Sequence, residues 1–320
     1  MRAVRCADKS VEVVDLPAPV GEGVRVKVIS AGICGSDLHL LKSDFQLPYT
    51  LGHELAGELD NGQQVAIEPI SPCGECDCCQ RGDYNLCQIG PSMIYGSGRD
   101  GGMAEQVLVP ERALVPLPTG VLAKDACLVE PLAVAEHGLR LADVRSQTRV
   151  AVIGGGSIGL CAIAAISGRG SRPLLVARHD GQREAGAKLG GLVGGSVGTA
   201  GADESRYDVV IDAAGTPSAL AQALQLCRPG GTLLLLATYW DGFELPGFLL
   251  CLKEIRIVPA SMYGTSGGTR DIERAAALMG GNPEIAKTLI THRFPLEAAQ
   301  EAFAAAADRS GGAIKVLLEP

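Results

Sequence analysis

Residues 149–159 read Arg-Val-Ala-Val-Ile-Gly-Gly-Gly-Ser-Ile-Gly, a short apolar run that leads directly into spaced glycines. The run predicts a buried strand, and the sequence from Ser157 onward predicts a helix. Glycines at such a turn let the backbone approach a pyrophosphate, and the helix N-terminus adds N–H donors and partial positive charge. This context favours a dinucleotide-binding turn over a merely tight structural turn. The predicted cofactor contacts here are Gly154, Gly156, Ser157, Ile158 and Gly159.

The region around this turn alternates apolar strands with alanine-rich helices. Further strands are predicted at 174–177, 209–213 and 232–237, and helices at 157–167, 182–189 and 218–227. The alternation implies a parallel sheet covered on both faces, and hence an α/β fold. Ala237 and Thr238, at the end of the last of these strands, are further predicted cofactor contacts. Residues before about 131 instead form short β-rich runs between Gly, Pro and Asp turns, as in antiparallel sheet.

The end of the second strand bears on which dinucleotide is bound. An NAD site usually places a carboxylate there to accept hydrogen bonds from the ribose, whereas an arginine attracts a 2′-phosphate. Arg178 therefore favours NADP, and His179 and Arg183 could assist it. For Arg183 the alternative is an ordinary solvated helix charge. Asp180 keeps NAD open, because a shift of two residues could put a carboxylate near the ribose.

Four cysteines follow the spacing Cys73-x2-Cys76-x2-Cys79-x7-Cys87, which can enclose one Zn²⁺ in a closed tetrahedral set of thiolates. Disulfides in a secreted domain are the alternative. The first residues lack the apolar core of a signal peptide, and eleven cysteines are an odd number scattered through a long chain. The spacing therefore predicts a structural zinc site, with Cys78 as a free thiol.

A chemically different set of potential ligands precedes this cluster. Cys34, His53 and Glu54 offer a thiolate, an imidazole and a carboxylate. Such a mixed set is typical of a zinc ion that keeps one position open for water or substrate. A closed site and an open site in one chain suggest an enzyme.

Length and charge narrow the class of protein. At 320 residues the chain suggests two domains, and its net charge of −8 argues against nucleic acid or an anionic membrane surface as partners. The uncharged stretch 150–168 is long enough to raise the question of a membrane helix. Its glycines favour the turn described above, so we expect a soluble, cytoplasmic protein.

Taken together, these motifs resemble the zinc-dependent medium-chain alcohol dehydrogenase family. The resemblance covers essentially the whole chain, through segments 34–39 and 52–54, the four cysteines, segment 129–137 and the glycine turn, in that order. It implies a catalytic domain at 1–131, built on a GroES-like β-barrel and carrying the structural zinc lobe. It further implies a doubly wound Rossmann domain at 132–262 and a return to the catalytic domain at 263–320. The family also implies a homodimer or homotetramer.

By resemblance, Cys34 and His53 are ligands of the catalytic zinc. Glu54 matches the family's adjacent glutamate, and Glu130 stands where simple alcohol dehydrogenases carry a second cysteine. The form with Glu130 resembles sorbitol, threonine and cyclitol dehydrogenases, in which one or other glutamate completes the site with water. Which of the two binds stays open. The alternative for Glu54 is pairing with an arginine outside the coordination sphere.

The resemblance also implies a proton path. Zinc would lower the pKa of the alcohol, and hydride would then pass to the nicotinamide. Ser36 matches the hydroxyl that takes the alcohol proton, and His39 would receive it through the nicotinamide ribose. The alternatives are a turn hydroxyl for Ser36 and a surface histidine for His39. The predicted catalytic residues are Ser36, His39 and Glu54.

Three functions fit these features. The leading hypothesis is an NADP-dependent zinc dehydrogenase acting on a secondary alcohol, polyol or cyclitol, or on the matching ketone. Segment 98–105, rich in glycine, suggests an amino alcohol such as threonine instead. A non-catalytic nucleotide-binding sensor is the third, and the intact proton path argues against it. Four residues are candidates for lining the substrate cleft, with the hydrophobic core as the alternative for each: Phe45, Tyr49, Met93 and Tyr95.

Overall fold

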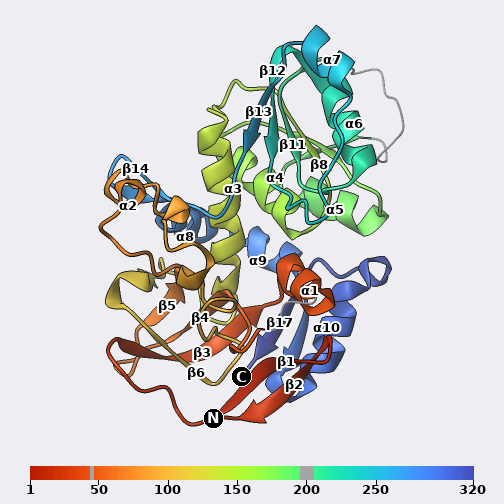
Figure 1. Cartoon of the computed structure of the whole chain (residues 1–320). Helices are drawn as coiled ribbons and strands as arrows, with labels where there is room; N and C mark the ends of the chain where they lie inside the picture. The colour runs from red at the N-terminus through yellow and green to blue at the C-terminus, as the bar shows by residue number, and fades with distance from the viewer. Residues whose placement is uncertain (44–46, 195–204) are drawn as a thin grey trace. The chain divides into compact units, whose positions relative to one another are not determined.

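The computed structural model describes residues 1–43, 47–194 and 205–320, and the chain divides into two compact units. Unit 1 comprises Met1–Glu130 and Tyr263–Pro320, and unit 2 comprises Pro131–Met262. Helix α3 (Val129–Leu141) contains the first boundary between them (Figure 1).

Unit 2 is built on a parallel sheet of six strands. They are β8 (Val150–Ile153), β9 (Leu174–Val176), β10 (Leu192–Val193), β11 (Tyr207–Asp212), β12 (Cys227–Leu235) and β13 (Arg256–Pro259). The strand order is β10-β9-β8-β11-β12-β13. Figure 1 labels β8, β11, β12 and β13 of this sheet. The order reverses between β8 and β11, and ligands of such sheets bind beside the carboxyl ends of the strands at that point.

The helices that follow α3 in unit 2 alternate with these strands. They are α4 (Ser157–Gly168), α5 (Asp180–Lys188), α6 (Pro217–Leu226) and α7 (Gly247–Leu252). All four residues of β8 are buried, as parallel strands covered on both faces require. The predicted alternation is confirmed from β8 to β12, with ends shifted by a few residues. The two-residue strand β10 and the edge strand β13 were not predicted, because neither short sequence has a clear hydrophobic pattern.

Unit 1 is built on a mixed sheet with strand order β16-β17-β3-β4-β5-β7, and β6 also pairs with β3. Its strands are β3 (Val24–Gly32), β4 (Glu54–Glu58), β5 (Gln64–Ile67), β6 (Gln106–Val109), β7 (Leu114–Pro116), β16 (Ile290–Pro295) and β17 (Lys315–Glu319). Two hairpins accompany it, β1 (Arg2–Ala7) with β2 (Ser10–Asp15), and β14 (Thr265–Ser266) with β15 (Thr269–Arg270). The returning segment therefore completes the sheet, because β17 pairs with β3.

Short helices connect these strands. The α-helices are α1 (Gly35–Lys42), α2 (Asp77–Gln80), α8 (Asp271–Gly281), α9 (Glu284–Leu289) and α10 (Ala299–Ala307). The 3-10 helices are η1 (Tyr84–Leu86), η2 (Gly90–Met93), η3 (Glu111–Ala113), η4 (Ala126–Leu128), η5 (Leu296–Ala298) and η6 (Arg309–Gly311).

Gly32 marks the centre of this sheet. Its register partner is Leu317 in β17 on one side and Glu54 in β4 on the other. A Cβ atom at this position would lie 2.2 Å from Oε2 of Glu54. Only glycine therefore leaves room for the Glu54 side chain against β3.

The connection between β4 and β5 is a tight turn. The N–H of Gly62 donates to the carbonyl of Leu59 at 2.8 Å, and Gly62 has a φ of +83°. The side-chain oxygen Oδ1 of Asn61 accepts a hydrogen bond from the backbone N–H of Gln63. A glycine in the left-handed region after such a turn is a common way to close a short hairpin. Residues 60–62 thus form a tight hairpin between β4 and β5.

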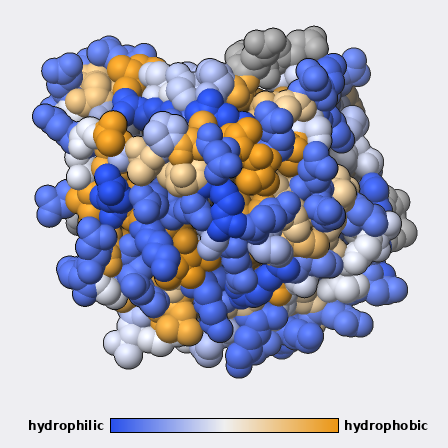
Figure 2. Space-filling model, turned by 90° about the horizontal axis from the view of Figure 1, so that it is seen from below, coloured by the Kyte–Doolittle hydropathy of each residue, from blue (hydrophilic) through white to orange (hydrophobic). Residues whose placement is uncertain are grey.

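Figure 2 shows one face of the molecule, on which hydrophilic residues predominate and hydrophobic residues occur in scattered groups. In the described parts of the chain, no helix combines the length and the apolar character needed to span a membrane.

Candidate functional site

The four predicted cysteines converge in unit 1. Sγ–Sγ distances are 3.4 Å for Cys73 and Cys87, 3.5 Å for Cys76 and Cys79, 3.8 Å for Cys76 and Cys87, and 3.9 Å for Cys73 and Cys79. A tetrahedron with Zn–S bonds of about 2.3 Å has edges of about 3.8 Å. A disulfide would require about 2.05 Å. The cluster therefore has the dimensions of a closed four-thiolate zinc site.

Backbone N–H groups prepare this cluster for metal. The N–H of Cys73 lies 3.3 Å from Sγ of Cys87, and that of Cys76 lies 3.4 Å from Sγ of Cys73. Backbone hydrogen bonds from Gln88 and then Cys79 lower the pKa of Cys76 to about 6. A thiolate is the ligand form of cysteine, so these backbone donors favour the form of Cys76 that binds zinc, whereas burial raises the pKa of Cys79 to about 12. Cys78 lies outside the group of mutually close ligands and contacts Arg81 instead.

Cys34, His53 and Glu54 also converge, with one potential ligand atom from each lying within 4.8 Å of the others. The pairing of β3 with β4 brings them together. Cys34 follows β3 and precedes helix α1, whereas His53 directly precedes β4 and Glu54 begins it. This group could hold a second metal ion, because the residues supply a thiolate, an imidazole and a carboxylate.

Two neighbours orient the His53 ring. Nε2 lies 3.5 Å from Oγ of Ser36, and Nδ1 lies 3.6 Å from Oδ1 of Asp37. Asp37 is 1% exposed and accepts a hydrogen bond from the N–H of Cys34. Burial lowers the pKa of His53, but the charges of Asp37 and Cys34 outweigh it and raise the pKa well above its usual value. A metal ion at Nε2 would displace the proton of a charged imidazole, and the Asp37 carboxylate lies on the opposite, Nδ1 side of the ring.

Sequence reasoning did not single out Asp37. Its signal was a carboxylate three residues after the N-cap residue Cys34, where it caps the helix by accepting from the Cys34 N–H. The second contact, with His53, comes from a distant part of the chain and leaves no local pattern.

Glu54 forms a buried ion pair with Lys315 of β17. The two side chains are 1% and 2% exposed, and Nζ lies 2.7 Å from Oε1 of Glu54. Nζ also donates to the carbonyl of Ile33 at 3.1 Å. Burial lowers the pKa of Lys315, but Glu54 outweighs it and raises the pKa. The pairing weighed for Glu54 from the sequence thus exists with a lysine in place of an arginine.

Glu130 lies in the first turn of α3 and is 8% exposed. Among the residues that the structure describes, it is not part of the compact group formed by Cys34, His53 and Glu54. Burial raises the pKa of Glu130 to about 7, although His53 acts in the opposite direction. The charges of Glu130 and His53 therefore interact, although the Glu130 carboxylate does not belong to the group.

Helix α1 places the two residues of the predicted proton path one turn apart. Ser36 is half-buried beside His53, and His39 is exposed. Of the candidate cleft residues, Met93 and Tyr95 are 1% and 6% exposed. Tyr95 belongs to the hydrophobic core of unit 1, which favours the core alternative for it. Phe45 lies outside the described residues.

In unit 2 the glycines of the turn have different physical reasons. Gly154 has a φ of +111°, and a Cβ there would lie 2.9 Å from the backbone of Ala213. A Cβ at Gly159 would lie 1.9 Å from the carbonyl oxygen of Gly154. Gly156, directly before α4, has no atom within 4 Å of its notional Cβ. Packing explains Gly154 and Gly159, whereas Gly156 leaves open the space that an approaching pyrophosphate needs.

The end of β9 lies against this turn, because a Cβ at Gly155 would meet Ala177 at 2.8 Å. Arg183 donates to the carbonyls of Ala177 at 2.7 Å and Arg178 at 3.0 Å, and it also pairs with Asp180. His179 is the N-cap of α5. Arg183 is thus occupied within unit 2, and it neutralises Asp180. Within the described ranges, the exposed guanidinium of Arg178 has no ion-pair partner.

The loop after β11 is held by the buried carboxylate of Asp212. This group accepts from the N–H groups of Ala214 at 2.8 Å and Gly215 at 3.0 Å, and from the Tyr239 hydroxyl at 2.5 Å. Ala237 lies next to this loop, because a Cβ at Gly215 would meet that of Ala237 at 3.0 Å. Ala237 and the exposed Thr238 thus follow β12 at the same edge of the sheet as the glycine turn.

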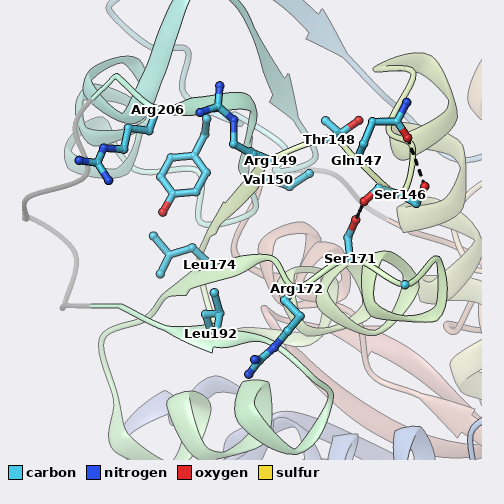
Figure 3. Close-up of a pocket in the computed structure, with 12 residues that line it drawn as sticks. Ser146, Gln147, Thr148, Arg149, Val150, Ser171, Arg172, Leu174, Leu192 and Arg206 are labelled. Atoms are coloured by element: carbon cyan, nitrogen blue, oxygen red, sulfur yellow. Dashed lines mark hydrogen bonds between the residues drawn. The ribbon is translucent and has the colours of Figure 1, made fainter.

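A hollow of about 490 Å³ lies at the opposite ends of these strands. It is lined by residues at the amino ends of the strands, including Arg149, Arg172, Leu174 and Arg206 (Figure 3). Ligands of doubly wound sheets bind at the carboxyl ends, so this hollow is not the expected cofactor site.

Comparison with known proteins agrees with this geometry. Residues 21–119 match the alcohol dehydrogenase GroES-like domain, and residues 157–280 match the zinc-binding dehydrogenase family. Sorbitol dehydrogenase of Halalkalibacterium halodurans is 31% identical, with 95% of this chain and 93% of that protein covered. The chain belongs to the zinc-dependent medium-chain alcohol dehydrogenase family.

Solved members of this family have the same fold. Galactitol-1-phosphate dehydrogenase from Escherichia coli matches with a TM-score of 0.90 and 27% identity over all of both chains. A protein from Sinorhizobium meliloti, described as a zinc-binding dehydrogenase and solved with NADP, matches with a TM-score of 0.84 and 29% identity over 100% of this chain and 99% of that one. The predicted GroES-like and α/β fold, the enzyme class and zinc as its metal are confirmed.

The two metal groups should separate in mutants. Cys34→Ser should abolish turnover and leave nucleotide binding largely intact, because it removes a ligand of the open group. Cys76→Ser should mainly destabilise the cysteine lobe, because a closed site supplies folding energy. Metal content, activity and thermal unfolding of both variants check this. Loss of both metals from each single variant would contradict separate sites.

Lys315→Met tests the buried ion pair. Removing one partner leaves a buried charge uncompensated, so we expect the metal-free protein to lose about 3–5 kcal/mol of unfolding free energy. The loss should be smaller with zinc bound, because the metal can take the freed Glu54 carboxylate. Denaturant unfolding with and without zinc measures both values, and Lys287→Met on an exposed helix position is the control. An equal loss in the two states would place Glu54 beyond reach of the metal.

Proposed function

We propose that this chain is an NADP-dependent zinc dehydrogenase that transfers a hydride between NADP(H) and a secondary alcohol, polyol or cyclitol, or the matching ketone. The observation that carries the proposal is the mixed group of Cys34, His53 and Glu54 beside the Ser36 hydroxyl. A hydroxyl next to the imidazole of an open metal site can take the proton of a bound alcohol.

The ligand roles follow from the two groups. Cys73, Cys76, Cys79 and Cys87 would hold the structural zinc, and Cys34 and His53 the catalytic one. Glu54 or Glu130 would complete the catalytic site. A zinc ion held there would act as a Lewis acid and lower the pKa of an alcohol.

This chain's own residues would manage the proton. The Asp37 carboxylate lies 3.6 Å from Nδ1 of His53, on the side of the ring away from Ser36, and Nε2 faces Ser36. Ser36 would accept the alcohol proton, and His39, one turn further along α1, would release it to solvent. The exposure of His39 suits that last step, because an imidazole at the surface can pass a proton to water.

The proposal of NADP over NAD rests on charges at the end of β9. Asp180, the residue that favoured NAD, is neutralised by Arg183, whereas the Arg178 guanidinium is exposed. A guanidinium binds phosphate through parallel charge-assisted hydrogen bonds. The Sinorhizobium meliloti relative was solved with NADP, which supports the same choice. Around the glycine turn, Gly154, Gly156, Ser157, Ile158 and Gly159 would contact the pyrophosphate, with Ala237 and Thr238 further along the cofactor.

Relatives point to polyhydroxylated substrates. They include sorbitol dehydrogenases, an L-idonate 5-dehydrogenase and an L-galactonate-5-dehydrogenase. The threonine alternative rested on the glycine-rich segment 98–105. Within unit 1, a Cβ at Gly98 would lie 2.2 Å from the carbonyl of Pro91, and one at Gly101 would lie 2.2 Å from that of Gly52. Close packing therefore accounts for these glycines without an amino substrate.

We also propose a homodimer or homotetramer that acts in the cytoplasm. Strand β13 is the last strand of its sheet, and Phe248 of the preceding helix α7 is 83% exposed. An edge strand that follows a helix with exposed apolar side chains is suited to pairing with a second copy. A reducing compartment would keep the cysteines as thiols and metal ligands.

The experiment that tests the proposal is a substrate panel with the zinc-loaded protein. Reduction of NADP and of NAD is followed with sorbitol, other polyols, cyclitols, simple secondary alcohols and threonine, and the reverse reaction with matching ketones. We expect turnover of a polyhydroxylated secondary alcohol with NADP. Turnover of threonine alone would favour the amino alcohol alternative, and no turnover of any alcohol or ketone would contradict the proposal.

Ser36→Ala should lower kcat by roughly 10²-fold or more, the usual scale for a general acid–base group. His39→Gln should have a smaller effect, because water can replace the last member of a proton path. Steady-state rates across pH measure both variants. Wild-type rates and pH profiles in both would show that the proton leaves by another route.

Arg178→Asp should raise the KM for NADP and shift preference toward NAD. Loss of a hydrogen bond to a charged group costs about 1.5–3 kcal/mol, which is about 10- to 150-fold in preference. Arg172→Asp is the matched control, because it makes the same charge change at the opposite edge of the sheet. Comparing kcat/KM for both cofactors checks this. A wild-type preference for NAD would assign the ribose to Asp180.

A further inference from the structure

The Tyr263 side chain is fully buried in unit 1, and it is among the largest side chains with no exposed surface. Its hydroxyl has no hydrogen-bond partner within 3.5 Å in the described residues. Leaving a buried hydroxyl unsatisfied is costly, and such groups are rare enough in folded proteins that each needs an explanation. The position therefore raises the question of what the hydroxyl is kept for.

Three polar groups lie near this hydroxyl. Burial raises the pKa of Tyr263 well above its usual value, and the charges of Glu130, Glu68 and the neighbouring Tyr84 raise it further, in that order. Reciprocally, the Tyr263 hydroxyl acts to lower the pKa of Glu130. The two groups are thus close enough to influence each other, although their geometry is not that of a regular hydrogen bond.

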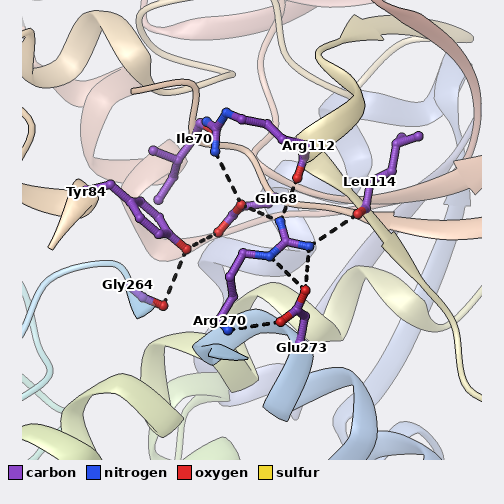
Figure 4. Close-up of polar contacts among 8 residues, drawn as sticks. All are labelled: Glu68, Ile70, Tyr84, Arg112, Leu114, Gly264, Arg270 and Glu273. Carbon is purple, nitrogen blue, oxygen red and sulfur yellow. Dashed lines mark hydrogen bonds and ion pairs between the residues drawn. The ribbon is translucent and has the colours of Figure 1, made fainter. Parts of the chain in front are cut away.

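Two of these neighbours are already occupied, as Figure 4 shows. Glu68 receives the Tyr84 hydroxyl on Oε1, and it receives Nη1 of Arg270 at 2.8 Å on Oε2. The Tyr84 hydroxyl donates its proton in that contact. The one side-chain hydrogen-bond partner that acts on Glu130 among the described residues is the Tyr263 hydroxyl. A carboxylate can accept several hydrogen bonds, so Glu68 is not excluded by its own contacts, but Glu130 is the neighbour that receives no other hydrogen bond or ion pair, and we take it as the acceptor for Tyr263.

The chain path makes this contact consequential. Glu130 is the last residue of the first segment of unit 1, and Tyr263 is the first residue of the returning segment. A hydrogen bond between them would join the two ends at which the chain leaves and re-enters the unit. It would also restrict a carboxylate that lies near His53.

We propose that Tyr263 is a positioning residue, whose hydroxyl donates a hydrogen bond to Glu130 and holds that carboxylate toward the metal group of Cys34 and His53. The inference rests on the proposed function, since it concerns the same metal site. It assigns the buried hydroxyl a partner and explains how a glutamate outside the compact ligand group is kept ready for it.

Tyr263→Phe tests this with the ring, and hence the packing, preserved. Partners behind a metal site typically change metal affinity or activity by 10- to 100-fold when removed. We expect a fall of about tenfold or more in the affinity of the Cys34 site for Co²⁺, measured by chelator competition with zinc kept in the four-cysteine site. The visible spectrum of the bound Co²⁺ should also change, which reports on ligand geometry independently of activity.

Two controls separate positioning from stability. Tyr84→Phe removes another buried hydroxyl of unit 1, and it should change Co²⁺ affinity by less than about twofold on the scale of independent sites. In a Glu130→Leu background, Tyr263→Phe should have almost no further effect, because a residue that acts through Glu130 has nothing left to position. An unchanged Co²⁺ affinity and spectrum in Tyr263→Phe, or an equal loss in the Glu130→Leu background, would overturn the proposal. Because these readouts need no turnover, they remain decisive even if the substrate panel shows no dehydrogenase activity.

Discussion

The buried ion pair between Glu54 and Lys315 is the interaction on which the arrangement of unit 1 depends. Charges at this depth are tolerated only when they are paired and hydrogen-bonded, so β4 and β17 must both be in register with β3. Gly32 permits this, because any side chain there would meet the Glu54 carboxylate. The same register places Cys34 beside His53. The metal group and the ion pair are therefore two results of one strand alignment.

At the glycine turn of unit 2, packing and the proposed cofactor site likewise depend on the same few residues. Packing against neighbouring backbone fixes Gly154 and Gly159, and open space surrounds Gly156. Arg183 holds the end of β9 by donating to two carbonyls, and in doing so it covers the charge of Asp180. Arg183 is thus a structural residue that also sets the charge at this strand end, where the ribose of a bound cofactor would lie.

Much of this could be predicted from the sequence, because the signals are local. The glycine turn, the alternating strands and helices and the spacing of the four cysteines all lie within short segments. The partners of the site could not be predicted, since Lys315 is 261 residues from Glu54 and Asp37 of α1 is 16 residues from His53. The sequence offered pairing with an arginine as one alternative for Glu54, but only the pairing of β17 with β3 identifies a lysine as its partner.

The central claim is that the strand alignment around Gly32 creates an open metal site in addition to the closed four-cysteine site. X-ray diffraction on crystals of the zinc-loaded protein, recorded on both sides of the zinc absorption edge, tests it most directly. The account predicts two anomalous peaks per chain, one among the four cysteine sulfurs and one bound by Cys34 Sγ and His53 Nε2. A single peak in the cysteine lobe, or a second peak away from Cys34 and His53, would contradict it.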